Sequence, residues 1–398
     1  MWLDVILWAA YLACSWTWCI GMFLPVLLVR DYGIMGWVVF AIPNVIGAAA
    51  MGWVLRDGMS ERIVRDHPGA IETFRLVTVV FQLWFLLVYL APPLGGQDLI
   101  GVQLERSVVI AAVLLGTVLG LRSRWSLFAW LISLGCVAIA LLRQGPTSGG
   151  VVEPPSGTAL LWLAPVCAFG FALCPYLDPT FHQARQSMKA SSARVAFSIG
   201  FGVLFLTMIA FTLLYAKWLL EVPLGGPGPG GLILSAVAVH IGLQLAYTST
   251  VHARSRVGSG SWSASRVAFA MVLAGLAALA AAFLPSHAGL EAREGVYRAF
   301  MAFYGLVFPA YVWLCMIPFG SGLDGDDAPP ARSSTVRLAV PSDRARRVFF
   351  VTIGLAAPFY WMGFIERQEL WLAPGLAIVL IARLLIRPRP ASAPASAR

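Results

Sequence analysis

Long apolar segments dominate this chain, and they restrict its fold more than any other feature. A helix needs roughly 20 apolar residues to cross the hydrocarbon core of a bilayer. Only 12% of the 398 residues are charged and 59% are hydrophobic, which is too little charge to cover a water-soluble domain of this length. The sequence therefore predicts an all-α polytopic protein surrounded by the lipid bilayer. About twelve spans are expected, at 3–29, 34–55, 73–91, 107–121, 125–142, 158–177, 193–216, 232–252, 264–284, 297–319, 347–364 and 369–386.

The distribution of basic residues predicts how the chain is oriented. If the N-terminus is cytoplasmic, 21 of the 28 Lys and Arg residues fall in cytoplasmic segments and 7 on the other side. This bias follows the positive-inside rule and favours cytoplasmic N- and C-termini in the cell (inner) membrane. The basic cytoplasmic segments also explain the net charge of +9. Nucleic-acid binding is not expected, because the basic residues do not form a stripe on a soluble module.

Polar segments divide the chain into two groups of five spans and a C-terminal extension. We expect a first group at 1–143, a second group at 158–320, and two additional helices at 347–386. A polar cytoplasmic linker at 321–346 precedes these helices, and the low-complexity tail at 387–398 is expected to be disordered. An odd number of spans in each group makes the second group inverted relative to the first.

The first and sixth spans both contain interruptions, and these spans open the two groups. Gly21–Pro25 and Gly170–Pro175 carry the glycine and proline residues that weaken a helix. Paired interruptions at matching positions of inverted repeats point to the central site of a transporter, although kinks also occur in ordinary membrane helices. The residues predicted to contact a small-molecule solute flank the two interruptions: Ser15, Trp16, Trp18, Gly21, Gly170, Cys174 and Tyr176.

Two stretches resemble a known transporter family. "CSWTWCIGM" in the first span and "YLDPTFHQARQSMKASSARVA" after the sixth are similar to the sodium/solute symporter family. This family belongs to the amino acid–polyamine–organocation superfamily, whose fold is a five-plus-five inverted repeat with broken first and sixth helices. The chain lacks the family's extra helix before the first core span, and Asp178-Pro179 replaces its usual asparagine-glutamine.

The resemblance implies an ion site in the eighth span. Proteins of this fold often bind sodium between the broken first helix and an Ala-x-x-Ser/Thr-Ser/Thr group, which Ala246, Ser249 and Thr250 match. Hydroxyl and carbonyl oxygens suit a hard cation, but small hydroxyl residues are also ordinary helix-packing groups.

Three further polar residues are candidates for proton coupling or for a gate. Asp178 before Pro179 is typical of a helix N-cap followed by proline at the first helical position, so a capping role is the alternative. His240 lies inside the eighth span with Gln244 one turn later. An ionisable residue within a membrane span indicates function, whereas the alternative is a neutral histidine hydrogen-bonded between helices. A metal site is not expected, because one His and one Gln supply too few ligands.

These observations predict a secondary active transporter that moves a small solute by alternating access, coupled to sodium or to protons. No GxxxxGK[ST] sequence indicates ATP hydrolysis, and no other cofactor and no enzymatic activity is expected. One alternative is a membrane-embedded enzyme that uses Asp178, His182 and His240. Another is a transporter-like sensor or scaffold. The oligomeric state is left open.

Overall fold

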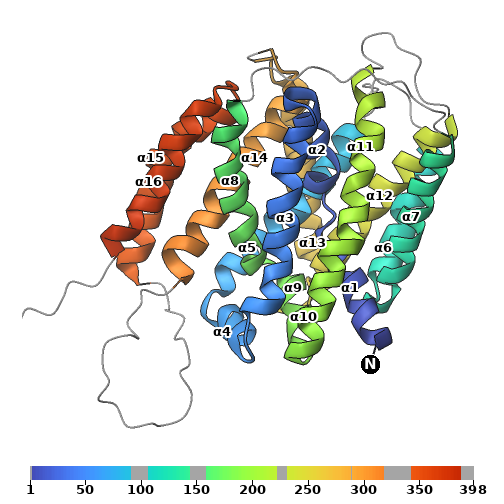
Figure 1. Ribbon diagram of the computed structural model, residues 1–398, viewed down its shortest axis with the longest axis horizontal. Coiled ribbons are helices and arrows are strands. Elements are labelled where there is room, and N and C mark those ends of the chain that lie inside the picture. The colour runs from blue at the N-terminus through green and yellow to red at the C-terminus, as the bar shows by residue number, and fades with distance from the viewer. Residues whose placement is uncertain are drawn as a thin grey trace, which may run out of the picture.

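The protein is an all-helical bundle. The computed structural model describes residues 2–90, 106–143, 158–221, 231–287, 289–317 and 342–386, and within these ranges the only β-type pairing is an isolated bridge between His287 and Leu290. The helices run roughly alongside one another between two ends of the bundle (Figure 1). We call the end where α1 begins the N-terminal face, and the other end the opposite face.

The elements follow the predicted spans closely. The first half contains α1 (Trp2–Trp16), α2 (Cys19–Tyr32), α3 (Ile34–Val54), α4 (Met59–Asp66), α5 (Pro68–Phe85) with its π-helical end η1 (Leu86–Leu90), α6 (Arg106–Gly120), η2 (Ser123–Trp125) and α7 (Ser126–Arg143). The second half contains α8 (Ala159–Leu173), η3 (Cys174–Leu177), α9 (Pro179–Gln186), α10 (Ala190–Ile199), η4 (Gly200–Phe205), α11 (Leu206–Glu221), α12 (Gly231–Arg254), α13 (Ala264–Phe283), α14 (Ala292–Tyr311) and η6 (Val312–Met316). The last elements are α15 (Asp343–Phe364), η7 (Glu369–Trp371), α16 (Leu372–Ala382) and η8 (Arg383–Ile386).

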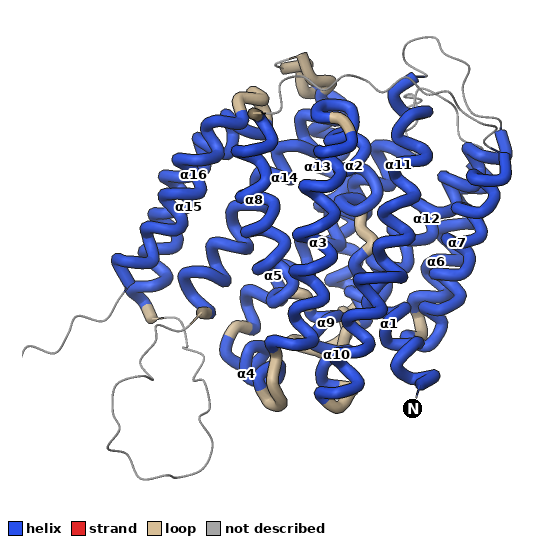
Figure 2. The backbone as a smooth tube through the Cα atoms, in the orientation of Figure 1, coloured by secondary structure: helices blue, strands red, loops and turns tan. Residues whose placement is uncertain are grey.

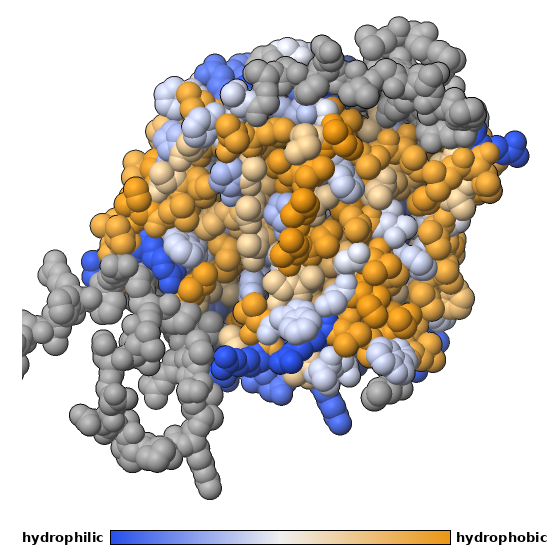
Figure 3. Space-filling model, in the orientation of Figure 1, coloured by the Kyte–Doolittle hydropathy of each residue, from blue (hydrophilic) through white to orange (hydrophobic). Residues whose placement is uncertain are grey.

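The outer surface fits a lipid environment, so this chain is a polytopic membrane protein. Apolar side chains cover the middle of the visible surface, and polar side chains gather toward both ends (Figure 3). Large apolar side chains such as Ile46, Leu114 and Met271 are more than half exposed. An exposed apolar belt of this kind is expected where lipid replaces water.

Helices occupy all twelve expected positions, but one of them is short. Ten helical segments in the described ranges are long and apolar enough to cross a membrane, and the bent pair α1 and α2 adds an eleventh. The expected fourth span is α6, which has only 15 residues and is shorter than a full crossing. Of the predicted boundaries, α15 begins at Asp343 rather than at 347, while the residues at 321–341 and 387–398 lie outside the described part of the chain.

Helix α12 lies in the centre of the bundle, and fifteen of its 24 residues are buried. It packs against α1, α5, α6 and α7, while α15 and α16 pack on each other and join the bundle through α14 and α8 (Figure 1). Two contacts are especially close because a glycine meets a backbone carbonyl. A methyl group on Gly47 of α3 would overlap the Phe171 carbonyl of α8, and one on Gly116 of α6 would overlap the Leu243 carbonyl of α12.

Candidate functional site

The first span is broken near the middle of the bundle. Helix α1 ends at Trp16, α2 begins at Cys19, and their axes differ by 59°. Figure 2 shows the intervening residues as a loop segment inside the bundle. The break lies at Thr17–Trp18, so the expected position at Gly21–Pro25 is wrong: Gly21 and Pro25 both lie within α2. Trp18 adopts an extended backbone (φ −91°, ψ 173°), which interrupts the helix without a glycine or proline at that position.

Neighbouring helices satisfy the polar backbone groups that the break frees. The Cys19 amide donates to Gln82 Oε1 of α5 at 3.1 Å, and the Tyr297 hydroxyl of α14 donates to the Cys19 carbonyl at 3.2 Å. From α12, Thr248 Oγ1 donates to the Cys14 carbonyl at 3.0 Å and lies 3.4 Å from the Thr17 carbonyl. Irregular backbone at membrane depth is tolerated only when it is buried in protein or lines a polar cavity, and here three helices supply that environment.

The sixth span is not broken as the first is, so the interruption expected at Gly170–Pro175 is wrong: α8 and η3 form one apolar segment, Ala159–Leu177, and Gly170 lies within α8. That helix runs through Gly170 to Leu173 and continues as the short 3₁₀ segment η3 before α9 begins. Asp178 is the N-cap of α9, with its Oδ1 accepting from the Thr180 amide at 2.7 Å, and Pro179 is the first helical residue. The predicted capping role of Asp178 is confirmed.

A cavity lies between the break in the first span and the α8–η3 segment. Its empty volume, including the open mouth, is about 640 Å³. The break contributes Trp16 and Trp18, and α14 contributes Tyr304. Asn44 of α3 and Phe364 at the end of α15 complete parts of the wall, and Asn44 Oδ1 accepts from Trp16 Nε1 at 2.7 Å. Among the described residues that line it, none carries a charge; aromatic rings and small side chains predominate.

Most of the residues predicted to contact a solute line this one cavity. Five of the seven do so: Trp16, Trp18, Gly21, Gly170 and Cys174. Ser15 is instead fully buried and lies 3.1 Å from Thr180 Oγ1, which joins α1 to α9. Tyr176 faces a separate apolar cleft near α4, beside Met59 and Ile63.

The residues predicted to hold sodium do not all face the break. Thr250 Oγ1 donates to the Ala246 carbonyl at 2.8 Å, and its side chain packs where α6 approaches at Gly120. Thr248 makes the contact with the break, although the family spacing does not select it. Ser249 is half-buried. The side chains at 248 and 250 point to different neighbours because successive helical residues are 100° apart.

The three candidates for proton coupling are also separated. His240 is fully buried against the Phe211 ring, and both of its ring nitrogens are without a hydrogen-bond partner. Gln244 Nε2 donates to Ser133 Oγ of α7 at 2.9 Å. Asp178 contacts His252 of α12, with 3.3 Å between Asp178 Oδ2 and His252 Nε2. Positions 240 and 252 on α12 are about 18 Å apart along the helix axis, so Asp178 and His240 do not form one site.

His252 is the functional candidate that sequence reasoning missed. It is the last residue of the predicted eighth span at 232–252, and the residues that follow it are basic. A signal was present nonetheless, because Thr248 and His252 are four residues apart and so share one face of α12. The His182 side chain is occupied elsewhere: its Nδ1 lies 2.9 Å from Ser60 Oγ and its Nε2 lies 3.0 Å from the Tyr176 carbonyl.

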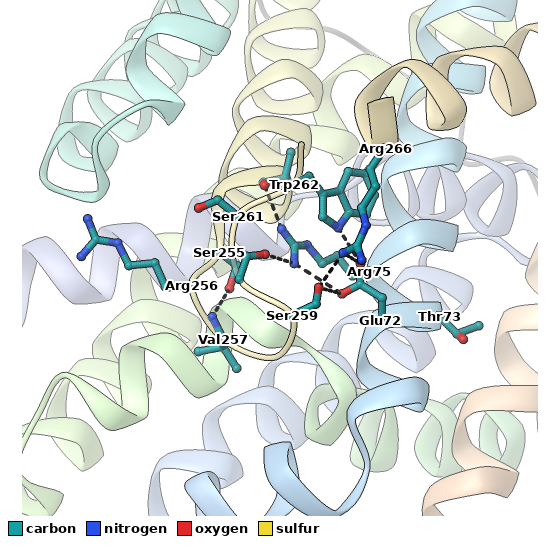
Figure 4. Close-up of polar contacts among 12 residues, drawn as sticks. Glu72, Thr73, Arg75, Ser255, Arg256, Val257, Ser259, Ser261, Trp262 and Arg266 are labelled. Atoms are coloured by element: carbon teal, nitrogen blue, oxygen red, sulfur yellow. Dashed lines mark hydrogen bonds and ion pairs between the residues drawn. The ribbon is translucent and has the colours of Figure 1, made fainter. Parts of the chain in front are cut away.

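Polar contacts around α5, α9 and α12 hold the elements of the N-terminal face together. Arg185 of α9 bonds to the Leu55 carbonyl at 2.9 Å and to Asp57 at 2.7 Å. The fully buried Arg75 of α5 donates to the carbonyls of Ala253 and Gly260, both at 2.8 Å. Figure 4 shows how Arg75 and its neighbour Glu72 hold the loop after α12 against α5.

The opposite face carries a cluster of five charged residues. Asp31 at the end of α2 pairs with Arg30 at 2.9 Å, with Arg298 of α14, and with Arg367 at 3.3 Å. Glu294 of α14 pairs with both Arg30 and Arg298. Only 3% of the Asp31 side chain is exposed, so the cluster ties the second half of the broken span to α14 away from bulk water.

In the described ranges, no group of three or more His, Cys, Asp or Glu side chains is placed to hold a metal ion. Comparisons of the chain with protein-family models, with curated proteins and with solved structures gave no match.

Proposed function

We propose that this protein is a secondary active transporter that carries a small solute across the membrane by alternating access. The observation that carries the proposal is the cavity between the interrupted first span and the α8–η3 segment. Transporters place the solute near mid-membrane between discontinuous helices, where closure on one side can alternate with closure on the other.

The cavity wall favours an uncharged organic solute. Trp16, Trp18, Phe171 and Tyr304 supply aromatic surface, and the Asn44 amide is the main polar side chain. Burying an ionised solute among these groups without a partner of opposite charge costs far more free energy than burying a neutral one. A neutral aromatic or aliphatic solute with one or two hydrogen-bonding groups fits this wall best.

The packing of the helices supports the inverted repeat on which alternating access depends. If each helix of the first group corresponds to the helix five spans later, contacts should occur in exchanged pairs. Three such exchanged pairs occur. The contact of α3 with α8 corresponds to that of α10 with α1, and the contact of α5 with α13 corresponds to that of α12 with α6. The contact of α1 with α7 corresponds to that of α8 with α14. The proposal keeps the predicted orientation, with the N-terminal face toward the cytoplasm of a cell (inner) membrane.

No observation favours the enzyme alternative over transport. Asp178 and His182 are engaged by different partners, and His240 lies on a distant turn of α12. A catalytic pair needs its acid and base within reach of one reacting atom.

A solute screen tests the proposal directly. We expect a neutral aromatic or aliphatic metabolite to raise the unfolding temperature of the purified protein, because a ligand that binds only the folded state stabilises it by mass action. A library of metabolites should be screened in the presence and absence of sodium, and each hit tested for uptake into proteoliposomes. Binding without uptake under any ion gradient would favour the sensor or scaffold alternative.

Sodium coupling makes a separate prediction about α12. We expect Thr248→Val to weaken sodium-dependent solute binding about tenfold, the effect of losing an oxygen contact worth roughly 1.4 kcal/mol. The double variant Ser249→Ala, Thr250→Ala is the matched control, since Thr250 faces Ala246 and α6 rather than the break. Solute affinity should be measured against sodium concentration for both. If the double variant loses the sodium response and Thr248→Val keeps it, the site follows the family spacing instead.

A further inference from the structure

His252 and Asp178 form a buried pair whose hydrogen bonds can be counted. His252 Nδ1 lies 2.9 Å from the Thr248 carbonyl, and His252 Nε2 lies 3.3 Å from Asp178 Oδ2. A carbonyl oxygen only accepts, so Nδ1 carries a hydrogen. A second proton must then lie between Nε2 and Oδ2, because otherwise a nitrogen lone pair would face an ionised carboxylate. The pair therefore holds either an imidazolium with a carboxylate or a neutral imidazole with a carboxylic acid.

The second carboxylate oxygen is fully occupied by α9. Asp178 Oδ1 accepts from the Thr180 amide at 2.7 Å and from the Thr180 hydroxyl at 2.6 Å. Thr180 also reaches Ser15 of α1. Because Asp178 and His252 are both fully buried, no solvent replaces a contact that is lost between them.

Other charged and titratable groups surround the pair on every side. Tyr11 of α1 and Tyr304 of α14 interact electrostatically with Asp178, and so does His182 of α9. Arg75 of α5 holds the Ala253 carbonyl next to His252. In this set Arg75 is the fixed positive charge, and it is engaged by the carbonyls of Ala253 and Gly260 and by Glu72 at 3.4 Å rather than by Asp178.

The pair lies between the cavity and the N-terminal face. The Trp18 ring lines the cavity and meets the His252 ring edge-on at 5.8 Å between centroids. On the far side of the pair, α9 continues to Arg185 and its contacts with Leu55 and Asp57. The pair thus connects to the solute cavity through Trp18 and to the N-terminal face through α9.

We propose that Asp178 and His252 hold one proton between them while the N-terminal face is closed, and that release of this proton separates α9 from α12 and opens the cavity to that face. Removing the proton leaves the Asp178 carboxylate against the Nε2 lone pair in a dry environment, which destabilises the closed arrangement. The inference rests on the transport function proposed above, to which it adds a proton as a coupling ion, with or without sodium.

Hydrogen exchange measured without any solute tests this step. In the purified full-length protein, peptides covering 179–186 and 248–254 should exchange faster as the pH rises, after correction for the intrinsic rate. The opening equilibrium constant should rise by up to about tenfold per pH unit, because one proton leaves in each opening event. Stability of the closed state is therefore present at low pH and lost as pH rises.

Asp178→Asn should remove this pH dependence. The new amide donates permanently to His252 Nε2, while the remaining oxygen still caps α9, so the variant should stay closed across the whole range. His252→Gln, which also cannot release a proton, is the second variant if Asp178→Asn does not fold. His240→Gln is the matched control: it replaces another fully buried histidine of α12 that does not touch Asp178, and it should keep the wild-type profile.

The imidazole nitrogens give a direct check. The protein has five histidines, so the nitrogen-15 signals that disappear in His252→Gln identify His252. Below the transition we expect one ring nitrogen to be protonated and the other to carry or share a proton. Opening that is independent of pH in the wild type, or an unchanged pH slope in both pair variants, would overturn the inference even if a transported solute were found. Conversely, pH-dependent opening that both variants abolish would support the pair even if no solute in the screen binds.

Discussion

Asp31→Asn should lower the free energy of unfolding by about 3–5 kcal/mol, the cost of breaking a buried ion pair by removing one partner. Asp31 is the common partner of Arg30, Arg298 and Arg367. Without its charge, Arg30 and Arg298 keep only Glu294, and Arg367 loses its ion pair. The loss should also loosen α2 from α14 on the opposite face, because these arginines lie on different elements. The unfolding midpoint of the protein in detergent measures the effect.

Asp57→Asn is the control for this prediction. Asp57 also pairs with an arginine, Arg185, but 81% of its side chain is exposed. The Arg185 side chain is only 5% exposed, but the Asp57 carboxylate lies in solvent, which screens the pair. The same chemical change should therefore lower the midpoint less than Asp31→Asn does. Equal losses for Asp31→Asn and Asp57→Asn would show that burial of the cluster on the opposite face does not matter.

Gly47→Ala should destabilise the protein by about 1–3 kcal/mol or more, because the added methyl group overlaps the backbone carbonyl of Phe171. A carbonyl within α8 cannot rotate away as a flexible side chain can, so α3 and α8 must move apart. This movement should also separate Asn44 from Phe171, which line the same cavity. Solute affinity should therefore fall together with the free energy of unfolding.

Gly170→Ala separates the two effects. No atom lies within 4 Å of a methyl group built on Gly170, and alanine favours a helix by roughly 0.5–1 kcal/mol over glycine. Gly170 lines the same cavity, so its substitution should change solute affinity without lowering the unfolding midpoint. If Gly47→Ala unfolds at the wild-type midpoint, the close approach of α3 and α8 is not needed for stability.

Much of the candidate site could be predicted because its local signals are strong. Asp178-Pro179 predicts a helix start. The Asp178 carboxylate accepts from the second helical amide and Pro179 is the first helical residue, and both interactions depend only on adjacent residues of the sequence. Trp16, Trp18 and Cys174 were selected because they flank interruptions, and all three line one cavity. The sequence predicts the first break too late, because Gly21 and Pro25 are the local helix-weakening signals. The extended backbone at Trp18 instead depends on contacts from α5, α12 and α14 with the neighbouring residues.

By itself, the sequence determined the class of the protein, the approximate limits of its helices and the presence of an interruption in its first span. Apolar length and helix-breaking residues act locally, so they can be read along the chain. Only the tertiary structure decided that Thr248 rather than Thr250 reaches the break, and that His252 rather than His240 meets Asp178. Residues 74 positions apart meet only when helices from both halves pack together, and the rotation of α12 about its axis, which chooses the side chain that faces the break, is set by that packing.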